Sequence, residues 1–330
     1  MLEKMISSGT LPASLLFTGP EGSGKELAAM RLAALLECES RTACGECPSC
    51  RSISSLEHPD VYPVYPVPSA DREKNIPVIL ESRREDFLAR GEFGNRVRSI
   101  GIEQIRKVME KISRQPFSGP RSVVVVMEAD LATMEAQNAF LKVLEEPPAS
   151  SDIVVVTGRS DLLLPTIVSR CSEIRFDSLP DAVTAEFLRT FLSVESGEAD
   201  RIAALAAGNF QRAVRLLDER FLALRKDALT LVGLVLEGKA RQLPAEAESA
   251  AHSYTREETA EMLGEMTEVM RGLLRGEETG ISPEAVSAVA LRDIPADIGK
   301  ISSASRNLRR NVDIELTLTQ LLLDLAGKWY

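Results

Sequence analysis

Seven residues near the start of the chain, Gly19-Pro20-Glu21-Gly22-Ser23-Gly24-Lys25, have the G-x-x-x-x-G-K spacing of a phosphate-binding loop. An expected strand (14–18) precedes this phosphate loop, and a helical pattern follows to about residue 37. In that setting, glycines let backbone N–H groups surround phosphate oxygens, and the helix N-terminus adds positive potential. An ordinary strand-to-helix turn is the alternative. The residues predicted to contact phosphate are Gly19, Gly22, Ser23, Gly24, Lys25 and the following Glu26.

The two positions that would hold Mg²⁺ beside such a loop are altered. The residue after the loop is normally Ser or Thr, whose hydroxyl binds Mg²⁺, but here it is Glu26. A carboxylate roughly 4 Å from a phosphate charge repels it by about 1–4 kcal/mol, so we expect Glu26 to turn away or to touch the metal directly. After the strand 123–126, Met127 replaces an Asp and cannot serve a hard cation. Glu128 remains where a general base would lie; a capping or surface role for Glu128 and Asp130 is the alternative.

Four of the five cysteines are clustered. Cys44, Cys47 and Cys50 are spaced three apart, and Cys38 lies six residues upstream. In a reducing compartment such a cluster indicates a metal site, and four thiolates close a tetrahedral Zn²⁺ site with Zn–S distances near roughly 2.3 Å. We therefore predict a structural zinc loop over residues 38–50. An iron–sulfur cluster and unligated thiols are the alternatives, and His58 is a possible substitute ligand, although a loop or capping role suits it better.

The expected elements place these residues in an α/β domain. Strands alternate with helices, which predicts a parallel sheet with helices on both faces, and the prolines in 61–67 predict that a strand there is either at an edge or irregular. Residues 70–98 are charged and poorly periodic, and we expect a largely irregular insertion. Beyond Leu179-Pro180 the pattern is helical only. The expected strands are 14–18, 61–67, 123–126, 153–156 and 174–176; the expected helices are 25–37, 102–112, 133–146, 162–170, 182–192, 198–207 and 210–217, with further helices over 221–330.

Composition limits the possible functions. The chain has 330 residues, with 39 Lys and Arg against 49 Asp and Glu, and a net charge of −10. Neither the first 176 residues nor the remainder is basic, so bulk charge cannot hold nucleic acid. No apolar run approaches the roughly 18 residues that span a bilayer, and the start shows no secretory signal. We expect a cytoplasmic protein with no membrane partner.

Several motifs resemble those of the AAA+ clamp-loader subunits of bacterial DNA polymerase III. Glu128-Ala129-Asp130 is followed by Glu135-Ala136-Gln137-Asn138-Ala139-Phe140-Leu141-Lys142-Val143-Leu144-Glu145-Glu146-Pro147-Pro148. The family's SRC motif matches Ser169-Arg170-Cys171, its four-cysteine loop matches the zinc loop, and its sensor-2 helix matches Gly208-Asn209-Phe210-Gln211-Arg212-Ala213. The resemblance covers about residues 5–60 and 100–220. Because Glu26 and Met127 erode the ATP motifs, the delta-prime type is favoured over the active gamma/tau type.

The resemblance implies an AAA+ P-loop domain over 1–177, a small helical lid over 178–220 and an all-α collar over 221–330, with Asn311-Val312-Asp313 leading into a collar helix over 316–325. A self-contained helical bundle is the alternative for the collar. The insertion 70–98 has no family role, and the chain begins close to its phosphate loop, whereas relatives usually have a preceding segment that helps form the adenine pocket.

The implied function is that of a stator in a hetero-pentamer with gamma/tau and delta subunits, which places the sliding clamp on primed DNA within the DNA polymerase III holoenzyme. Arg170 would be an arginine finger serving a neighbouring ATPase subunit, Thr157 sensor 1 and Arg212 sensor 2. Little or no ATP hydrolysis of its own is expected, and binding of ATP and Mg²⁺ stays open. The alternatives are an active gamma/tau-type ATPase and a free-standing zinc-containing DNA-binding protein, which the acidic balance opposes.

Overall fold

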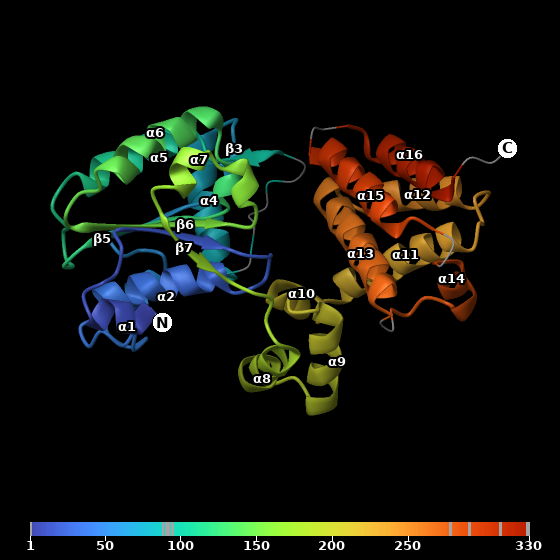
Figure 1. The fold of residues 1–330 in the computed structure, drawn as a ribbon, viewed down its shortest axis with the longest axis horizontal. Helices are drawn as coiled ribbons and strands as arrows, with labels where there is room; N and C mark the ends of the chain where they lie inside the picture. The colour runs from blue at the N-terminus through green and yellow to red at the C-terminus, as the bar shows by residue number, and fades with distance from the viewer. Residues whose placement is uncertain are drawn as a thin grey trace. The chain divides into compact units, whose positions relative to one another are not determined.

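The computed structural model describes residues 2–87, 89, 93, 96–276, 279–289, 292–309 and 312–327. The chain divides into two compact units (Figure 1), one of Met1–Phe93 with Arg98–Val214, the other of Gly94–Val97 with Arg215–Tyr330. Part of the expected insertion, residues 88, 90–92, 94 and 95, lies outside the described residues, as does Asn311.

The first unit contains a five-stranded parallel sheet. Its strands are β1 (Ser14–Thr18), β2 (Val61–Val64), β5 (Ser122–Val126), β6 (Ser151–Thr157) and β7 (Ser172–Arg175), in the order β2-β5-β6-β1-β7. The predicted edge position of β2, which contains Pro63, is confirmed. The register pairs Thr18 with Thr157. Because the strands are parallel, the residues that follow β1, β5 and β6 meet at one edge of the sheet.

Helices cover both faces of this sheet, because successive strand residues point to opposite sides. Leu15 and Phe17 face the layer of α2 (Lys25–Glu37), whereas Leu16 faces the layer of α5 (Ile102–Ile112). Figure 1 shows α2 on one side of the sheet and α5 and α6 on the other. The predicted α/β fold is confirmed. The remaining short elements on these layers are α1 (Leu2–Ser7), α3 (Pro48–Ser54), η1 (Ala129–Leu131), α6 (Met134–Glu145), η2 (Ser160–Leu162) and α7 (Pro165–Val168).

The insertion differs from the expectation. Instead of a largely irregular segment, residues Arg72–Glu85 form the 14-residue helix α4. Its apolar residues Ile76, Ile79 and Leu80 pack on the sheet core, and their spacing is helical. The many charged residues and the internal Pro77 argued against a helix in this segment. Burial of one face against the sheet core nevertheless stabilises the helix. The flanking strands β3 (Val67–Pro68) and β4 (Arg98–Ser99) pair antiparallel.

Three short helices follow the sheet within the first unit. They are α8 (Asp181–Leu192), α9 (Ser196–Ala206) and α10 (Phe210–Arg215), close to the expected positions. Helices α8 and α9 pack together through the buried side chains of Ala185, Leu188 and Ala199. We call these three helices the lid.

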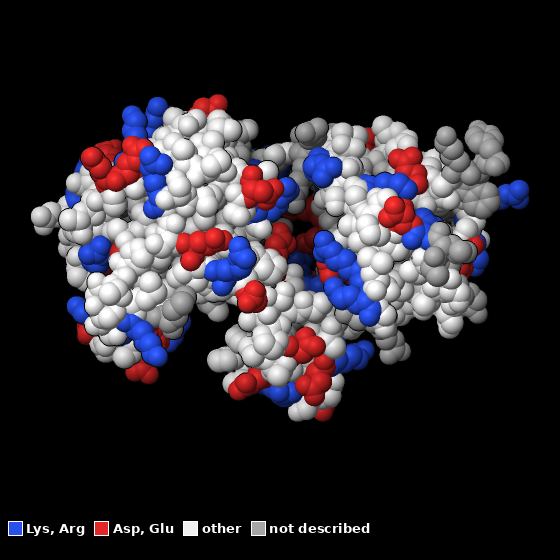
Figure 2. All heavy atoms as spheres, in the orientation of Figure 1, with Lys and Arg blue, Asp and Glu red and all other residues white. Residues whose placement is uncertain are grey.

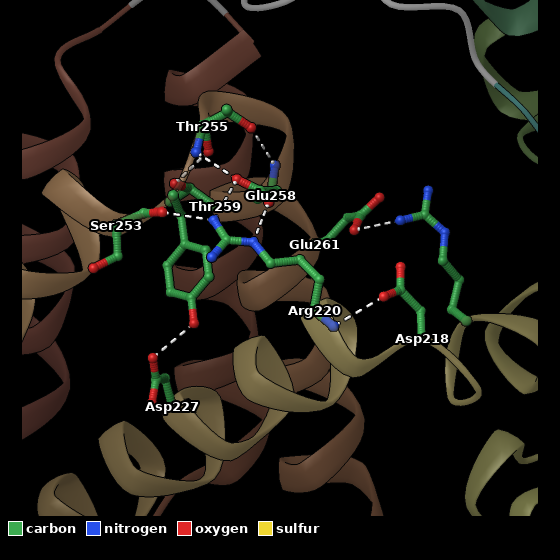
Figure 3. A network of polar contacts seen from close by, with 10 residues as sticks. Asp218, Arg220, Asp227, Ser253, Thr255, Glu258, Thr259 and Glu261 are labelled. Carbon is green, nitrogen blue, oxygen red and sulfur yellow. Dashed lines mark hydrogen bonds and ion pairs between the residues drawn. The ribbon is translucent and has the colours of Figure 1, made fainter.

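The second unit is helical throughout its described residues. A polar network around Arg220 ties its helices together (Figure 3), since the guanidinium donates to Glu258 Oε1 at 2.8 Å and to the Ser253 carbonyl at 2.7 Å. Thr255 and Glu258 form a capping box that starts α13. The helices are α11 (Glu219–Leu236), α12 (Leu243–Ser253), α13 (Arg256–Arg275), α14 (Pro283–Ala288), α15 (Ile294–Arg309) and α16 (Ile314–Ala326).

Charge is mixed on the visible face of the molecule. On the face that Figure 2 shows, acidic and basic side chains are interspersed and no extended basic patch is seen. None of the described helices has the length and apolar character needed to cross a membrane.

Candidate functional site

The phosphate loop connects β1 to α2, as predicted. Gly24 caps α2 with φ 82°, and Gly22 has φ 71°; both lie in the left-handed region that favours glycine. The buried Lys25 ammonium donates to the Pro20 carbonyl at 2.8 Å, and burial lowers the pKa of Lys25. The buried Ser23 hydroxyl has no hydrogen-bond partner among the described residues. The loop therefore has the shape of a phosphate cradle whose lysine is bonded to the loop itself.

The lid touches the tip of this loop. The Phe210 N–H donates to the Gly22 carbonyl at 3.0 Å, and a Cβ added at Gly22 would lie 1.8 Å from Asn209 Oδ1. The same Asn209 oxygen accepts the N–H of Arg212 at 3.0 Å and so starts α10. The structure thus brings the helix that carries Arg212, the predicted sensor 2, onto the phosphate loop.

Residues 127–130, which we call the acidic motif, follow β5 at the same edge of the sheet. Met127 is fully buried in the core, which explains why a thioether stands there and confirms that no metal-binding carboxylate does. Glu128 adopts φ 46°, a left-handed conformation that costs about 1–2 kcal/mol outside glycine. Asp130 accepts the Thr157 hydroxyl at 2.7 Å, and that hydroxyl accepts the Arg159 N–H at 2.9 Å. Thr157, the predicted sensor 1, is therefore held by the acidic motif.

Arginines from the insertion occupy both carboxylates at this edge. Arg83 Nη1 donates to Glu26 Oε2 at 3.0 Å, and its Nη2 lies 4.0 Å from Glu128 Oε1. Arg98 donates to both oxygens of Glu128, at 3.2 and 3.4 Å. Glu26 thus turns toward a cation of the chain itself. The side-chain oxygens that Mg²⁺ would require are in ion pairs, so the residues present do not fit a divalent cation here.

The sequence analysis did not identify Arg83 or Arg98 as site residues. Arg83 continues the spacing of Ile76, Ile79 and Leu80, which places it on the buried face of α4, and this spacing is the signal that could have found it. Without the helix, a basic residue in a charged insertion gives no reason to expect burial.

Arg170 lies two residues after α7, in the predicted SRC motif. Its Nη2 donates to Glu145 Oε1 at 2.6 Å, and its Nη1 donates to the Thr166 carbonyl at 3.0 Å. The Arg170 side chain is 33% exposed and that of Glu145 is 51% exposed. A single surface carboxylate therefore orients this guanidinium while leaving part of it open to solvent.

The four clustered cysteines converge between the end of α2 and the start of α3. The sulfur atoms of Cys38 and Cys44 are 3.7 Å apart, those of Cys38 and Cys47 3.9 Å, and those of Cys44 and Cys50 4.0 Å. A tetrahedral site with Zn–S near 2.3 Å requires sulfur separations of roughly 3.8 Å. Hydrogen bonds, chiefly from the Ser40 hydroxyl and backbone N–H groups, lower the pKa of Cys38 to about 4, whereas burial raises the pKa of Cys50 to about 12. The geometry of the four sulfur atoms, rather than these opposite shifts, therefore supports a metal site. The four sulfur donors fit zinc. Cys38 joins the cluster although only six positions separate it from Cys44.

His58 belongs to a different cluster. It lies buried with Glu37 and Asp60, and its Nδ1 accepts the Asp60 N–H at 3.2 Å. Asp60 in turn accepts the N–H groups of Phe117, Ser118 and Gly119 and so fixes the loop before β5. His58 therefore has the loop-capping role that the sequence favoured and is not grouped with the cysteines.

Comparisons with known proteins identify the family. The family described as DNA polymerase III, delta subunit, matches residues 1–180, which is more than half of the chain. The delta′ subunit of DNA polymerase III from Pseudomonas aeruginosa is 30% identical over 205 residues, covering 61% of this chain and 54% of that protein. The chain belongs to the DNA polymerase III delta-prime-type clamp-loader family.

Other members of this clamp-loader family extend the match. The delta′ subunit of Bacillus subtilis is 29% identical over 66% of this chain and 57% of its own length, and the tau subunit of the same organism is 27% identical over 67% and 36%. This chain therefore spans about half the length of the delta′ relatives it matches. A DNA polymerase III gamma subunit-related protein from Thermotoga maritima has the same fold, with a TM-score of 0.51 over 98% of both chains at 19% identity.

Proposed function

We propose that this clamp-loader family member is a stator of the bacterial DNA polymerase III clamp loader and hydrolyses little or no ATP itself. The observation that carries the proposal is the state of its own phosphate-loop site. Glu26 and Glu128 are paired with Arg83 and Arg98, and Met127 replaces the metal-binding carboxylate. Phosphoryl transfer in this class of fold depends on a metal ion that bridges the phosphates, and at this site the carboxylates of Glu26 and Glu128 are already held by arginines.

A subunit of this kind can supply an arginine to the ATP site of a neighbouring subunit. Arg170 follows α7 in the matching SRC motif, is partly exposed and is oriented by Glu145 and the Thr166 carbonyl. An arginine finger supplied in trans stabilises the charge of the transferring phosphoryl group and is worth about 10³–10⁵ in rate. We assign this role to Arg170. We assign Thr157 as sensor 1, which holds the acidic motif in place, and Arg212 as sensor 2, which holds the lid in place.

The partners are proposed from the family and from the surface of the last helix. Relatives are named delta′, gamma and tau subunits, so we place this chain beside gamma/tau and delta subunits in a hetero-pentamer that loads the sliding clamp on primed DNA in the cytoplasm. Leu316 and Leu323, seven residues apart on α16, are exposed and share one helix face. We propose residues 221–330 as the ring-forming collar, after a P-loop domain over 1–177 and a lid over 178–220.

The zinc loop is assigned a structural role. Four thiolates would fill the coordination sphere of Zn²⁺ and leave no open position for substrate. Bound zinc would hold the connection between α2 and α3, next to the sheet, in one conformation. About one zinc per chain is expected.

Reconstitution tests the proposal directly. The purified chain is mixed with the gamma/tau and delta subunits of its own organism, and the mass of the assembly is measured. Incorporation of one copy per pentamer is expected, and failure to join any assembly would contradict the stator role.

An active gamma/tau-type ATPase is the second candidate, favoured by the retained Lys25 and by the tau relative. Steady-state ATP turnover by the isolated chain separates the two. The stator predicts no Mg²⁺-dependent rate above background, with or without DNA, whereas a robust rate would establish the second candidate.

A further inference from the structure

The cation that normally belongs to a phosphate-loop site is a metal, and in this chain a side chain lies in its place. The Arg83 guanidinium lies 3.0 Å from Glu26, the residue at the usual hydroxyl position, and 4.0 Å from Glu128, the first acidic residue after β5. One guanidinium therefore bridges the two elements that a Mg²⁺ ion bridges in a working site.

Arg83 is fixed where it lies. Its side chain is 3% exposed, and its guanidinium carbon lies 4.8 Å from the centre of the Tyr65 ring and 5.8 Å from that of Phe87. It also donates to the Phe87 carbonyl. A buried guanidinium with no anion is very costly, so its pairing with Glu26 is part of the fold and cannot be given up cheaply when a metal arrives.

The carboxylates are likewise already used. Arg98 holds both oxygens of Glu128, and Glu26 accepts from Arg83. A divalent ion would have to displace at least one of these arginines and would then lie beside the other positive charge. Mg²⁺ also requires nearly octahedral oxygen ligands at about 2.0–2.1 Å, which two paired carboxylates and a buried methionine do not supply.

We propose that Arg83 is a resident replacement for the divalent cation. Its guanidinium neutralises Glu26, lies beside Glu128, which also pairs with Arg98, and excludes Mg²⁺ and Mn²⁺ from the phosphate-loop site. The insertion helix α4 thereby gains a role, because it carries this cation into the sheet edge. The phosphate loop could then bind only an anion that carries no divalent metal ion. The proposal does not rest on Arg170 or on assembly, so failure of the loader experiments leaves it standing.

The test is a Mn²⁺ titration of the full, zinc-loaded chain, followed by electron paramagnetic resonance. The wild-type chain is expected to bind no Mn²⁺ at Glu26, so that the wild type and Glu26→Gln should give the same Mn²⁺ titration. Arg83→Met is expected to gain one site per chain, binding Mn²⁺ about tenfold or more tightly than wild type, because a positive charge has left two carboxylates. Adding Glu128→Gln to Arg83→Met should abolish the gain, which would locate the new ion.

Arg84→Met is the matched control, because Arg84 is the next residue of the same helix and pairs with Glu57 and Glu81 at the surface. It should gain no Mn²⁺ site. Arg83→Gln, whose amide can still donate to the Phe87 carbonyl, serves if the methionine variant does not fold. A wild-type Mn²⁺ site lost in Glu26→Gln would overturn the proposal, and so would a folded Arg83 variant that gains none.

Discussion

Two arginines of the first unit show opposite uses of the same side chain. Arg83 is almost completely buried, touches two aromatic rings and pairs with carboxylates inside the chain. Arg170 is one-third exposed and is paired with one surface carboxylate. A buried, multiply bonded guanidinium is a permanent structural charge, whereas an exposed guanidinium held by one surface carboxylate and one carbonyl can be transferred to another ligand at little cost. The comparison teaches that burial decides the use of a guanidinium: Arg83 neutralises carboxylates within its own unit, whereas Arg170 keeps part of its surface open to a further partner.

The largest expected effect is at the outward arginine. Arg170→Ala should lower ATP turnover at the neighbouring site of the reconstituted loader by about 10³-fold, because the transition-state charge loses its counter-ion. The measurement is single-turnover ATP hydrolysis, and Arg175→Ala, an exposed arginine five residues later, is the control. Equal turnover in both variants would contradict the proposal that Arg170 acts at the neighbouring site.

The next effect is on stability at the inward arginine. Arg83→Met should lower the free energy of unfolding by about 3 kcal/mol, since it leaves two partly buried carboxylates with less compensation. Arg84→Met, which breaks only surface pairs, should cost less than about 1 kcal/mol. Urea unfolding at neutral pH measures both. Equal costs would show that Arg83 is not a structural charge.

The zinc loop sharpens the comparison, because there a bound metal, rather than an arginine, would neutralise the clustered thiolates. Cys44→Ser should release about one zinc per chain and lower the free energy of unfolding by about 2–3 kcal/mol, the contribution of a ligand held near a hundredfold above its Kd. Metal analysis and thermal unfolding provide the readouts. Cys171→Ser, outside the cluster, should keep its zinc; a zinc-free wild-type chain with unchanged stability would contradict the assignment.

The smallest effect is expected at the partner of the outward arginine. Glu145→Gln should change the free energy of unfolding by less than about 1 kcal/mol, as for other exposed ion pairs. Turnover of the loader should fall less than tenfold, since Arg170 keeps its bond to the Thr166 carbonyl. Glu146→Gln is the neighbouring control. A loss as large as that of Arg170→Ala would mean that Glu145 is indispensable for presenting the guanidinium.

Much of the fold could be predicted because its signals are local. The buried β-branched run before Met127, the glycines of the phosphate loop and the cysteine spacing each specify an element or a site within a few residues. The helix α4 and its Arg83 could not, since their burial depends on contacts with Tyr65 and Glu26, which are distant in sequence. The sequence showed that the metal positions were altered, and the structure shows that arginines pair with the two carboxylates at this edge of the sheet.

The most direct test of the central claim is anomalous scattering from crystals of the full chain grown with MnCl₂ and ATP. The account predicts the Arg83 guanidinium between Glu26 and Glu128, with no Mn²⁺ peak at those carboxylates. A Mn²⁺ ion coordinated by Glu26 and Glu128, with Arg83 displaced, would contradict it.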